Sequence, residues 1–222
     1  MGEMIGKQSV KFAEAPYIFE GASVVGPKEG EGPLGKLFDV IEQDPMLGSK
    51  SWEEAESLLQ KETVQKLLLK SGLKKEDIRY IFAGDLLGQL IATTFGIMDY
   101  EIPFMGLYGA CSTMGEGLSL AAMMVAAGYG ENVIAMASSH FGSAERQFRF
   151  PLEYGNQRPF SATWTVTGCG AAIVTKRKGF ARITGVTTGK IIDYGVKDAQ
   201  NMGACMAPAA ADVIYNHLND FG

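Results

Sequence analysis

One stretch near the middle of the chain constrains the fold most, because it has the pattern of a strand, a turn, a helix and a second strand. Residues 102–107 form a short apolar run, and a turn of small residues carrying Cys111 follows it. An almost wholly apolar segment then continues to about Ala127, and residues 132–138 form a second apolar run. Strands that alternate with helices in this way favour a mostly parallel sheet covered on both faces.

The helix of this unit is apolar on nearly every face, which predicts burial on all sides. Gly115 and Gly117 lower its helix propensity, so we expect another helix or backbone segment to pack closely there. Glu116 stands between the two glycines. A buried carboxylate needs a partner, and we expect one of the arginines downstream to provide it.

The clearest helix covers residues 51–71. Ser51 and Glu54 fit a capping box, an apolar stripe follows, and Gly72 is a natural C-terminal stop. Other predicted elements are strands at 17–26, 79–84, 162–176 and 181–188, and helices at 87–98 and 204–218. The predicted class is therefore α/β. Because a crossover helix normally delivers a further strand, we expect the protein to continue beyond Gly222.

Charge, cysteine count and motifs exclude several classes of function. A formal net charge of −5 is unfavourable for neutralising phosphates, so no nucleic acid partner is expected. Three widely spaced cysteines and two histidines predict neither a disulfide framework nor a metal site, and we expect no cofactor. Phosphate-binding glycine loops, HExxH and GxSxG are absent from the sequence. We expect neither a signal peptide nor a membrane-spanning segment, so any work at a membrane would be peripheral.

Cys111 is the first residue that could carry chemistry. A thiol at the first turn of a helix lies near the positive end of the helix dipole and near free N–H groups, which favour the thiolate and could form an oxyanion hole. The alternative is a buried cysteine that acts as a small hydrophobic residue. A nucleophile also needs a base, and His140, just past an apolar strand, is the histidine nearest the turn. The alternative for His140 is a satisfied core histidine.

An arginine-rich, aromatic segment covers residues 141–159. Long structured loops of this kind are often functional. Guanidinium groups bind carboxylates through paired hydrogen bonds, and aromatic rings can stack on a planar ligand. The arginines concerned are Arg146, Arg149 and Arg158. The alternative is an internal ion-pair network with Glu145 and Glu153.

Three runs of sequence together resemble the stage V sporulation protein AD family of endospore-forming bacteria. They are GACSTMGEGLSLAAMMVAAG, SSHFGSAERQFRFPLEYGNQRP and NMGACMAPAAAD. The resemblance extends over nearly the whole chain. Its most specific part is the second run, whereas the cysteine turn also recurs across thiolases and ketoacyl synthases.

The resemblance implies a thiolase-like fold with α-β-α-β-α layers and mixed, mostly parallel sheets. Residues 1–178 would form its first half, and residues 179–222 the start of an incomplete second half. It also implies binding of dipicolinic acid (pyridine-2,6-dicarboxylate), free or as its calcium chelate, for loading into the developing spore, with a link to germination. The expected setting is peripheral at the spore inner membrane, beside membrane proteins of the same operon, and a homodimer is expected by analogy.

Cys111 falls where condensing enzymes hold their nucleophile. Their second-half His–His or His–Asn partners cannot be assigned in this chain, so we predict a non-catalytic binding protein in which Cys111 lines the pocket. The predicted ligand-binding residues are Cys111, Glu116, His140, Arg146, Arg149 and Arg158. The main alternative is a Cys111-dependent acyl-CoA condensing or thiolytic enzyme, an acyltransferase. A weaker alternative is a purely structural role in assembling a membrane complex.

Overall fold

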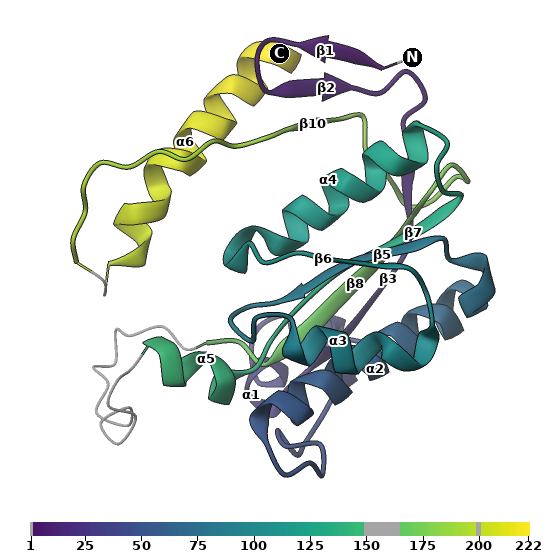
Figure 1. The fold of residues 1–222 in the computed structure, drawn as a ribbon, viewed down its shortest axis with the longest axis vertical. Helices are drawn as coiled ribbons and strands as arrows, with labels where there is room; N and C mark the ends of the chain where they lie inside the picture. Colours follow the sequence, from purple (N-terminus) through teal and green to yellow (C-terminus); the bar gives the residue numbers. More distant parts are fainter. Residues whose placement is uncertain (1, 149–164, 199–200) are drawn as a thin grey trace.

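A mixed seven-stranded sheet dominates the computed structural model, which describes residues 2–148, 165–198 and 201–222 (Figure 1). Its order is β4-β3-β8-β7-β5-β6, with β9 also paired to β3. The strands are β3 (Tyr17–Val25), β4 (Val40–Ile41), β5 (Tyr80–Asp85), β6 (Phe104–Gly106), β7 (Asn132–Ser139), β8 (Gly168–Thr175) and β9 (Ala181–Arg182). Strand β8 is antiparallel to both neighbours, whereas β7, β5 and β6 run parallel. The predicted α/β class and mostly parallel sheet are confirmed.

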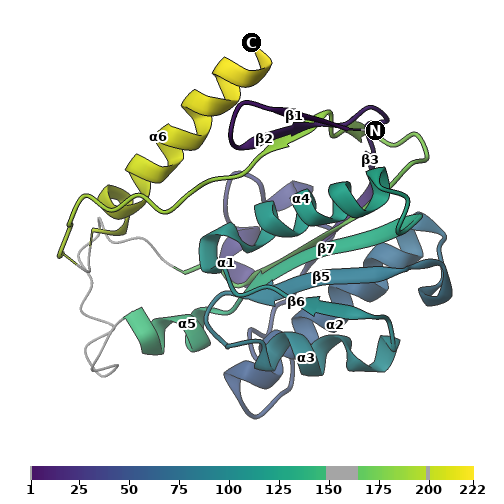
Figure 2. The same ribbon diagram turned by 45° about the horizontal axis from the view of Figure 1, so that its top comes forward.

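Helices cover both faces of this sheet (Figure 2). Helices α2 and α3 pack on one face and α4 on the other. The helices are α1 (Pro27–Gly30), α2 (Trp52–Ser71), α3 (Ile91–Ile97), α4 (Thr113–Ala126), α5 (Phe141–Phe148) and α6 (Met202–Phe221). Short 3-10 turns are η1 (Gly35–Leu37), η2 (Lys75–Asp77), η3 (Met98–Tyr100) and η4 (Ala110–Ser112). In the described parts of the chain, no helix is long and apolar enough to cross a membrane.

The core lies on both faces of the central strands. In β7, Ile134 and Met136 join the apolar cluster under α2, whereas Val133 and Ala135 join the cluster under α4. Successive side chains of a strand point to opposite faces, so a strand covered on both sides needs an unbroken apolar run. This explains why residues 132–138 carry no alternation.

Helix α2 begins and ends as its sequence predicts. The Ser51 hydroxyl accepts a hydrogen bond from the Glu54 backbone N–H, and Gly72 ends the helix in the left-handed region with φ 68°. The returning half of the capping box differs, because the Glu54 carboxylate accepts from the N–H of Lys50 rather than from that of Ser51. The cap therefore reaches one residue further back along the chain.

The prediction that α4 is buried on all sides is wrong. Its sheet-facing side is fully buried and includes Gly117, whose Cβ position lies 3.4 Å from the Cβ of Ala135. The close packing expected at Gly117 is confirmed, whereas no described atom of a neighbouring element lies within 4 Å of the Cβ position of Gly115, so the same expectation is wrong there. On the outer side Gly115 and Glu116 are exposed, because the described residues cover that side only in part.

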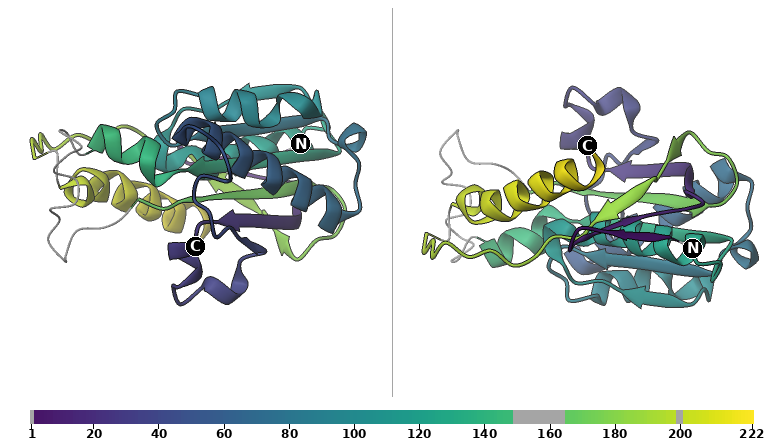
Figure 3. Two further views of the ribbon diagram at one scale, coloured as in Figure 1. Left: turned by 90° about the horizontal axis from the view of Figure 1, so that it is seen from below. Right: turned by 90° about the horizontal axis from the view of Figure 1, so that it is seen from above.

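A second, three-stranded sheet joins the two ends of the chain. It pairs β2 (Ser9–Lys11) with β1 (Glu3–Ile5) and β10 (Gly185–Thr187), and α6 lies beside it (Figure 3). The Ser9 hydroxyl donates to the Asp220 carboxylate at 2.6 Å and so fastens the helix to the sheet. The single strand expected at 181–188 is instead split between the two sheets. The amino-terminal residues therefore lie with the segment after residue 179, and the domain boundary at 178 stays a prediction.

Candidate functional site

Cys111 lies at the turn between β6 and α4, at the carboxyl edge of the main sheet. Its side chain is exposed, and it precedes a helix of 14 residues. The turn lies very close to β5: a Cβ on Gly84 would overlap the carbonyl oxygen of Leu107. Ala110 adopts a positive φ of 48°, which is costly for a residue with a Cβ. The backbone is therefore held in a strained shape immediately before the thiol.

Glu116 lies next to this turn but is not buried. Its Oε2 lies 2.9 Å from the Cβ position of Gly109, so the carboxylate folds back over the turn. A carboxylate in the first turn of a helix is stabilised by the helix dipole and by solvent. The expectation of a buried Glu116 is therefore wrong, and the described residues include no ion-pair partner for it. The structure does bring Cys111 and Glu116 to one turn.

His140 follows β7 at the same edge and is fully buried. Its Nδ1 accepts a hydrogen bond from the Gly142 N–H at 3.1 Å, so the ring proton is on Nε2, which donates to the Pro45 carbonyl oxygen at 2.7 Å. The ring stacks on Phe141 with centroids 5.0 Å apart. Burial lowers the pKa of His140 and keeps the imidazole neutral. Both ring nitrogens are thus occupied by backbone groups, as in a satisfied core histidine.

The three arginines cannot be placed in the site at side-chain level. Arg146 belongs to α5, which starts directly after β7, and only its backbone is described. Arg149 and Arg158 lie outside the described residues. Their contact with a ligand stays a prediction.

A pocket of about 320 Å³ adjoins the arginine-rich segment. Its lining residues are Pro27, Lys28, Glu29, Glu31, Pro45, Phe141, Thr165 and Thr167. Phe141 and Thr165 are the described residues at or near the two ends of the segment. The Oε1 of Glu29 accepts from the Thr167 N–H at 3.0 Å, whereas its Oε2 is buried and has no hydrogen-bond partner in the part of the chain that the structure describes. The sequence analysis missed Glu29, although its place just after β3 was a usable signal.

A buried polar network behind this edge was also missed. Glu56 is 1% exposed, and its two carboxyl oxygens contact the hydroxyls of Ser138 at 2.7 Å and Ser143 at 2.9 Å. The Ser143 hydroxyl also lies 3.0 Å from the carbonyl oxygen of His140. A carbonyl only accepts and a serine has one proton, so Ser143 either shares its proton between the Glu56 carboxyl and the His140 carbonyl, or donates to His140 and accepts from a protonated Glu56.

The surroundings of Glu56 favour a proton on its carboxyl group. Burial raises the pKa of Glu56 most, hydrogen bonds from the Ser138 and Ser143 hydroxyls lower it in part, and the nearby Asp85 charge raises it further, so the net shift is upward. Gln60 Nε2 donates to the Ser138 hydroxyl at 2.6 Å and to the Thr93 hydroxyl at 3.0 Å, and Thr93 in turn donates to Asp85 at 3.0 Å. The network therefore ties α2 and α3 to the carboxyl ends of β5 and β7, and it fixes the edge from which α5 starts.

A family model described as stage V sporulation protein AD (SpoVAD) matches residues 6–222. The chain belongs to this family. A curated relative, Stage V sporulation protein AD of Bacillus subtilis (strain 168), is 42% identical over 218 residues, which cover 98% of this chain and 64% of the relative. The chain thus spans less than two thirds of that relative's length. Membership in a sporulation family, as the resemblance implied, is confirmed.

Solved structures of an acyltransferase and of a polyketide synthase share the fold. Germicidin synthase from Streptomyces coelicolor, a type III polyketide synthase, has a TM-score of 0.54 at 13% identity, with 84% of this chain and 66% of that chain covered. The acyltransferase ChlB3 has a TM-score of 0.50 at 18% identity, with 76% and 52% covered. At these identities the likeness concerns the fold alone. The thiolase-like fold is confirmed.

Proposed function

We propose that this sporulation protein binds dipicolinic acid, free or as its calcium chelate, for uptake into the developing spore, and that it does so without catalysis. The observation that carries the proposal is the pocket beside the arginine-rich segment. Phe141 and Thr165 line that pocket, and the sequence between them carries three arginines, Arg146, Arg149 and Arg158. Two carboxylates on a flat ring suit such groups together with an aromatic side chain.

Two acidic residues of the pocket lining favour the chelate over the free dianion. Glu29 and Glu31 line the pocket together with Lys28, and the two carboxylates would repel free dipicolinate. The unpartnered Oε2 of Glu29 is an oxygen ligand of the kind that calcium prefers. A calcium ion held by dipicolinate would turn this repulsion into attraction.

The absence of catalysis is inferred from the surroundings of the thiol. Cys111 is exposed at its turn, and no hydrogen bond joins it to His140 in the described structure. His140 is neutral and already bonded at both ring nitrogens, so it is poorly placed to act as a base. On this proposal, Cys111 lines the site at the carboxyl edge of the main sheet and does not act as a nucleophile.

Calorimetric titration with dipicolinate, with and without calcium, tests this proposal. Replacing Arg146, Arg149 and Arg158 together by glutamine should weaken binding by about tenfold or more, because each lost charged hydrogen bond is worth a few kcal/mol. Glu29→Gln should weaken only the calcium-dependent part. Lys178→Gln, on an exposed turn outside this pocket, is the control. Unchanged affinity in the triple variant, or no binding by the parent protein, would contradict the proposal.

A second candidate function is Cys111-dependent acyl transfer. It is favoured by the exposed thiol at the amino end of α4 and by the strained Ala110 before it. Incubation with an acyl-CoA should then give a mass adduct that Cys111→Ser abolishes. A protein that acquires no adduct is not such an enzyme.

We further infer a homodimer and a peripheral place at the spore inner membrane beside membrane proteins of the same operon. Strand β6 ends the sheet order, and Met105 on it is exposed. Such an edge can pair with the same strand of a second copy. Sedimentation at micromolar concentration should show the dimer, and a monomer throughout would refute it.

The peripheral location has its own test. The protein should co-purify with spore inner membranes, and high salt rather than detergent should release it from them.

A further inference from the structure

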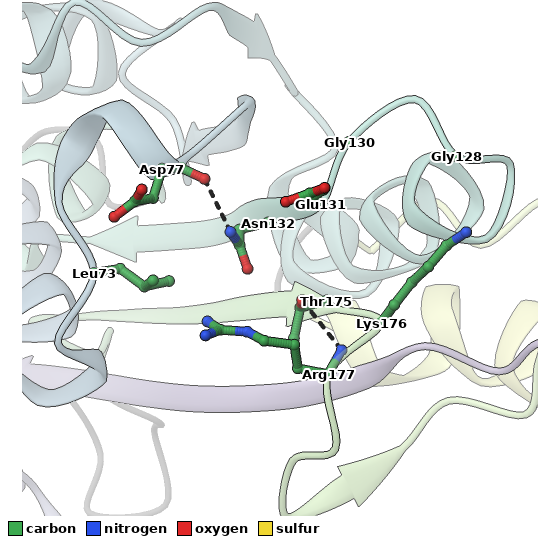
Figure 4. Close-up of a pocket in the computed structure, with 9 residues that line it drawn as sticks. All are labelled: Leu73, Asp77, Gly128, Gly130, Glu131, Asn132, Thr175, Lys176 and Arg177. Carbon is green, nitrogen blue, oxygen red and sulfur yellow. Dashed lines mark hydrogen bonds between the residues drawn. The ribbon is translucent and has the colours of Figure 1, made fainter.

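A separate cavity lies at the amino edge of the sheet, where β5 and β7 begin. It measures about 520 Å³, and three turns form its wall (Figure 4). Its lining residues are Leu73, Asp77, Gly128, Gly130, Glu131, Asn132, Thr175, Lys176 and Arg177. Strand β7 runs from Asn132 here to Ser139 at the opposite edge, a length of roughly 23 Å at the usual rise per residue. The cavity is therefore distinct from the Cys111 turn and from the pocket beside Phe141.

Asn132 gives this cavity an unsatisfied acceptor. The residue is 8% exposed, and its Nδ2 donates to the carbonyl oxygen of Asp77 at 3.0 Å. A carbonyl can only accept, so this bond fixes which end of the amide is oxygen. The Oδ1 is buried with no hydrogen-bond partner among the described residues, and it turns toward the side of the cavity where Thr175 and Arg177 lie (Figure 4). Buried acceptors are normally paired, so this oxygen points to a ligand that brings an N–H or O–H group.

Charges of opposite sign flank that oxygen. Asp77 and Glu131 lie on one side of the amide and Arg177 on the other, while Lys176 extends along the rim (Figure 4). The Arg177 guanidinium lies 4.3 Å from the centre of the Phe19 ring, and within the described residues no carboxylate forms an ion pair with it. Stacking on a ring leaves the edge of a guanidinium free for a carboxylate.

We propose that this cavity binds a small zwitterion of the α-amino acid class. The ammonium group donates to Asn132 Oδ1, and Asp77 and Glu131 attract it from the other side of the amide, although one Asp77 carboxylate oxygen already accepts from the Lys74 N–H at 2.8 Å. The carboxylate is held by Arg177, whose exposed side chain closes over it, with Lys176 adding charge at the rim. An adjoining hollow, which is lined by Ile78, Pro103 and Tyr129 as well as by the charged residues Glu76 and Arg79, offers room for the ligand's side chain.

Dipicolinate does not suit this cavity. At neutral pH it presents only acceptors, so it would leave the Asn132 oxygen unpaired. Arg177 and Lys176 could hold one of its carboxylates, but Asp77 and Glu131 would repel the second. The proposal therefore concerns a different ligand and a different edge of the sheet from the proposed function, and either can fail without the other.

Calorimetry or ligand-detected NMR with L-leucine tests the proposal, within a panel of the common L-amino acids. We expect saturable binding of one or more members. For L-leucine, two analogues of the same skeleton, 4-methylpentanoate without the ammonium and 3-methylbutylamine without the carboxylate, should each bind about tenfold more weakly or worse. Excess dipicolinate should not displace the amino acid.

Two variants from one turn provide the matched comparison. Arg177→Gln should weaken amino acid binding by about tenfold while leaving 3-methylbutylamine unaffected. Lys178→Gln, equally exposed in the same turn but outside the cavity lining, should change neither. The proposal is overturned if no amino acid of the panel saturates the protein in the millimolar range, if the two variants behave alike, or if dipicolinate competes.

Discussion

Replacing Glu56 by glutamine tests whether this buried side chain carries a proton in the folded protein. The carboxyl group lies between the Ser138 and Ser143 hydroxyls, and a proton on Glu56 would let Ser143 accept from it while donating to the His140 carbonyl oxygen. A glutamine side chain has nearly the same shape, with an N–H group to donate to Ser143 and a carbonyl oxygen to accept from Ser138. If Glu56 is protonated, Glu56→Gln therefore preserves every hydrogen bond of the network.

The expected difference in unfolding free energy between the parent and Glu56→Gln follows from the upward shift of the Glu56 pKa. Burial raises the pKa of Glu56 above its ordinary value of 4.5, so above that pH the unfolded chain has released a proton that the folded protein still holds. Glu56 therefore makes the free energy of unfolding fall as pH rises from 4.5 to the folded-state pKa, by up to about 1.4 kcal/mol per pH unit. The glutamine variant lacks this contribution, so its stability relative to the parent should rise by the same amount over that window.

Urea unfolding followed by tryptophan fluorescence at a series of pH values measures this difference. Near pH 4 the parent and Glu56→Gln should agree within about 1 kcal/mol, because both present a neutral group. Above pH 5 the variant should become progressively the more stable of the two. Glu76→Gln, at an exposed glutamate, is the control and should follow the parent. If Glu56 is instead ionised, Glu56→Gln should be less stable than the parent by several kcal/mol at neutral pH, or should differ from it by the same free energy of unfolding at every pH. Either result would contradict a proton on Glu56.

Three further experiments test the positions of single residues. Gly84→Ala should lower the free energy of unfolding in urea by about 1–3 kcal/mol, since its Cβ would overlap backbone, whereas Gly170→Ala, with open space around its Cβ position, should change it by less than about 1 kcal/mol. Cys111 should react with iodoacetamide in the folded protein, whereas Cys169, which is buried with its pKa raised to about 12, should react only after unfolding, as followed by peptide mass spectrometry. Ser51→Ala removes the α2 cap and should cost about 1 kcal/mol by the urea assay, so an unchanged midpoint would contradict the capping role.

The sequence was sufficient wherever the deciding interactions are local. A capped amphipathic stripe defines α2, and unbroken apolar runs define β5 and β7, because burial on both faces leaves no alternation. Strands β1, β2 and β10 have three residues each, and their existence depends on pairing between the two ends of the chain. Such short segments carry too little periodicity to be recognised before their partners are known.

In the candidate site too, the sequence predicted what depends on local pattern and not what depends on tertiary packing. The strand–turn–helix pattern placed Cys111 correctly, but the apolar content of α4 could not tell which of its sides a further layer covers, so Glu116 was wrongly expected to be buried. The prediction of α2 rests on its apolar residues alone and therefore does not include Glu56, a polar residue of the same buried face. Yet Glu56, Gln60 and Thr63 follow one another at spacings of four and three residues, so they share the buried face. Polar residues at core spacing were the available signal for the network.

The two proposed binding regions share strand β7, and this bears on whether they influence each other. Between Asn132 at one end and His140 beyond the other, β7 is paired on both sides, and its side chains from Val133 to Met136 are fully buried. Close-packed segments of this kind have a single arrangement, and coupling between sites requires an element with two. Substitutions at the two ends are also well beyond the range over which effects usually interact. Amino acid and dipicolinate should therefore bind independently, and a mutual change in affinity above about twofold would show that the strand, or the layers around it, has a second arrangement.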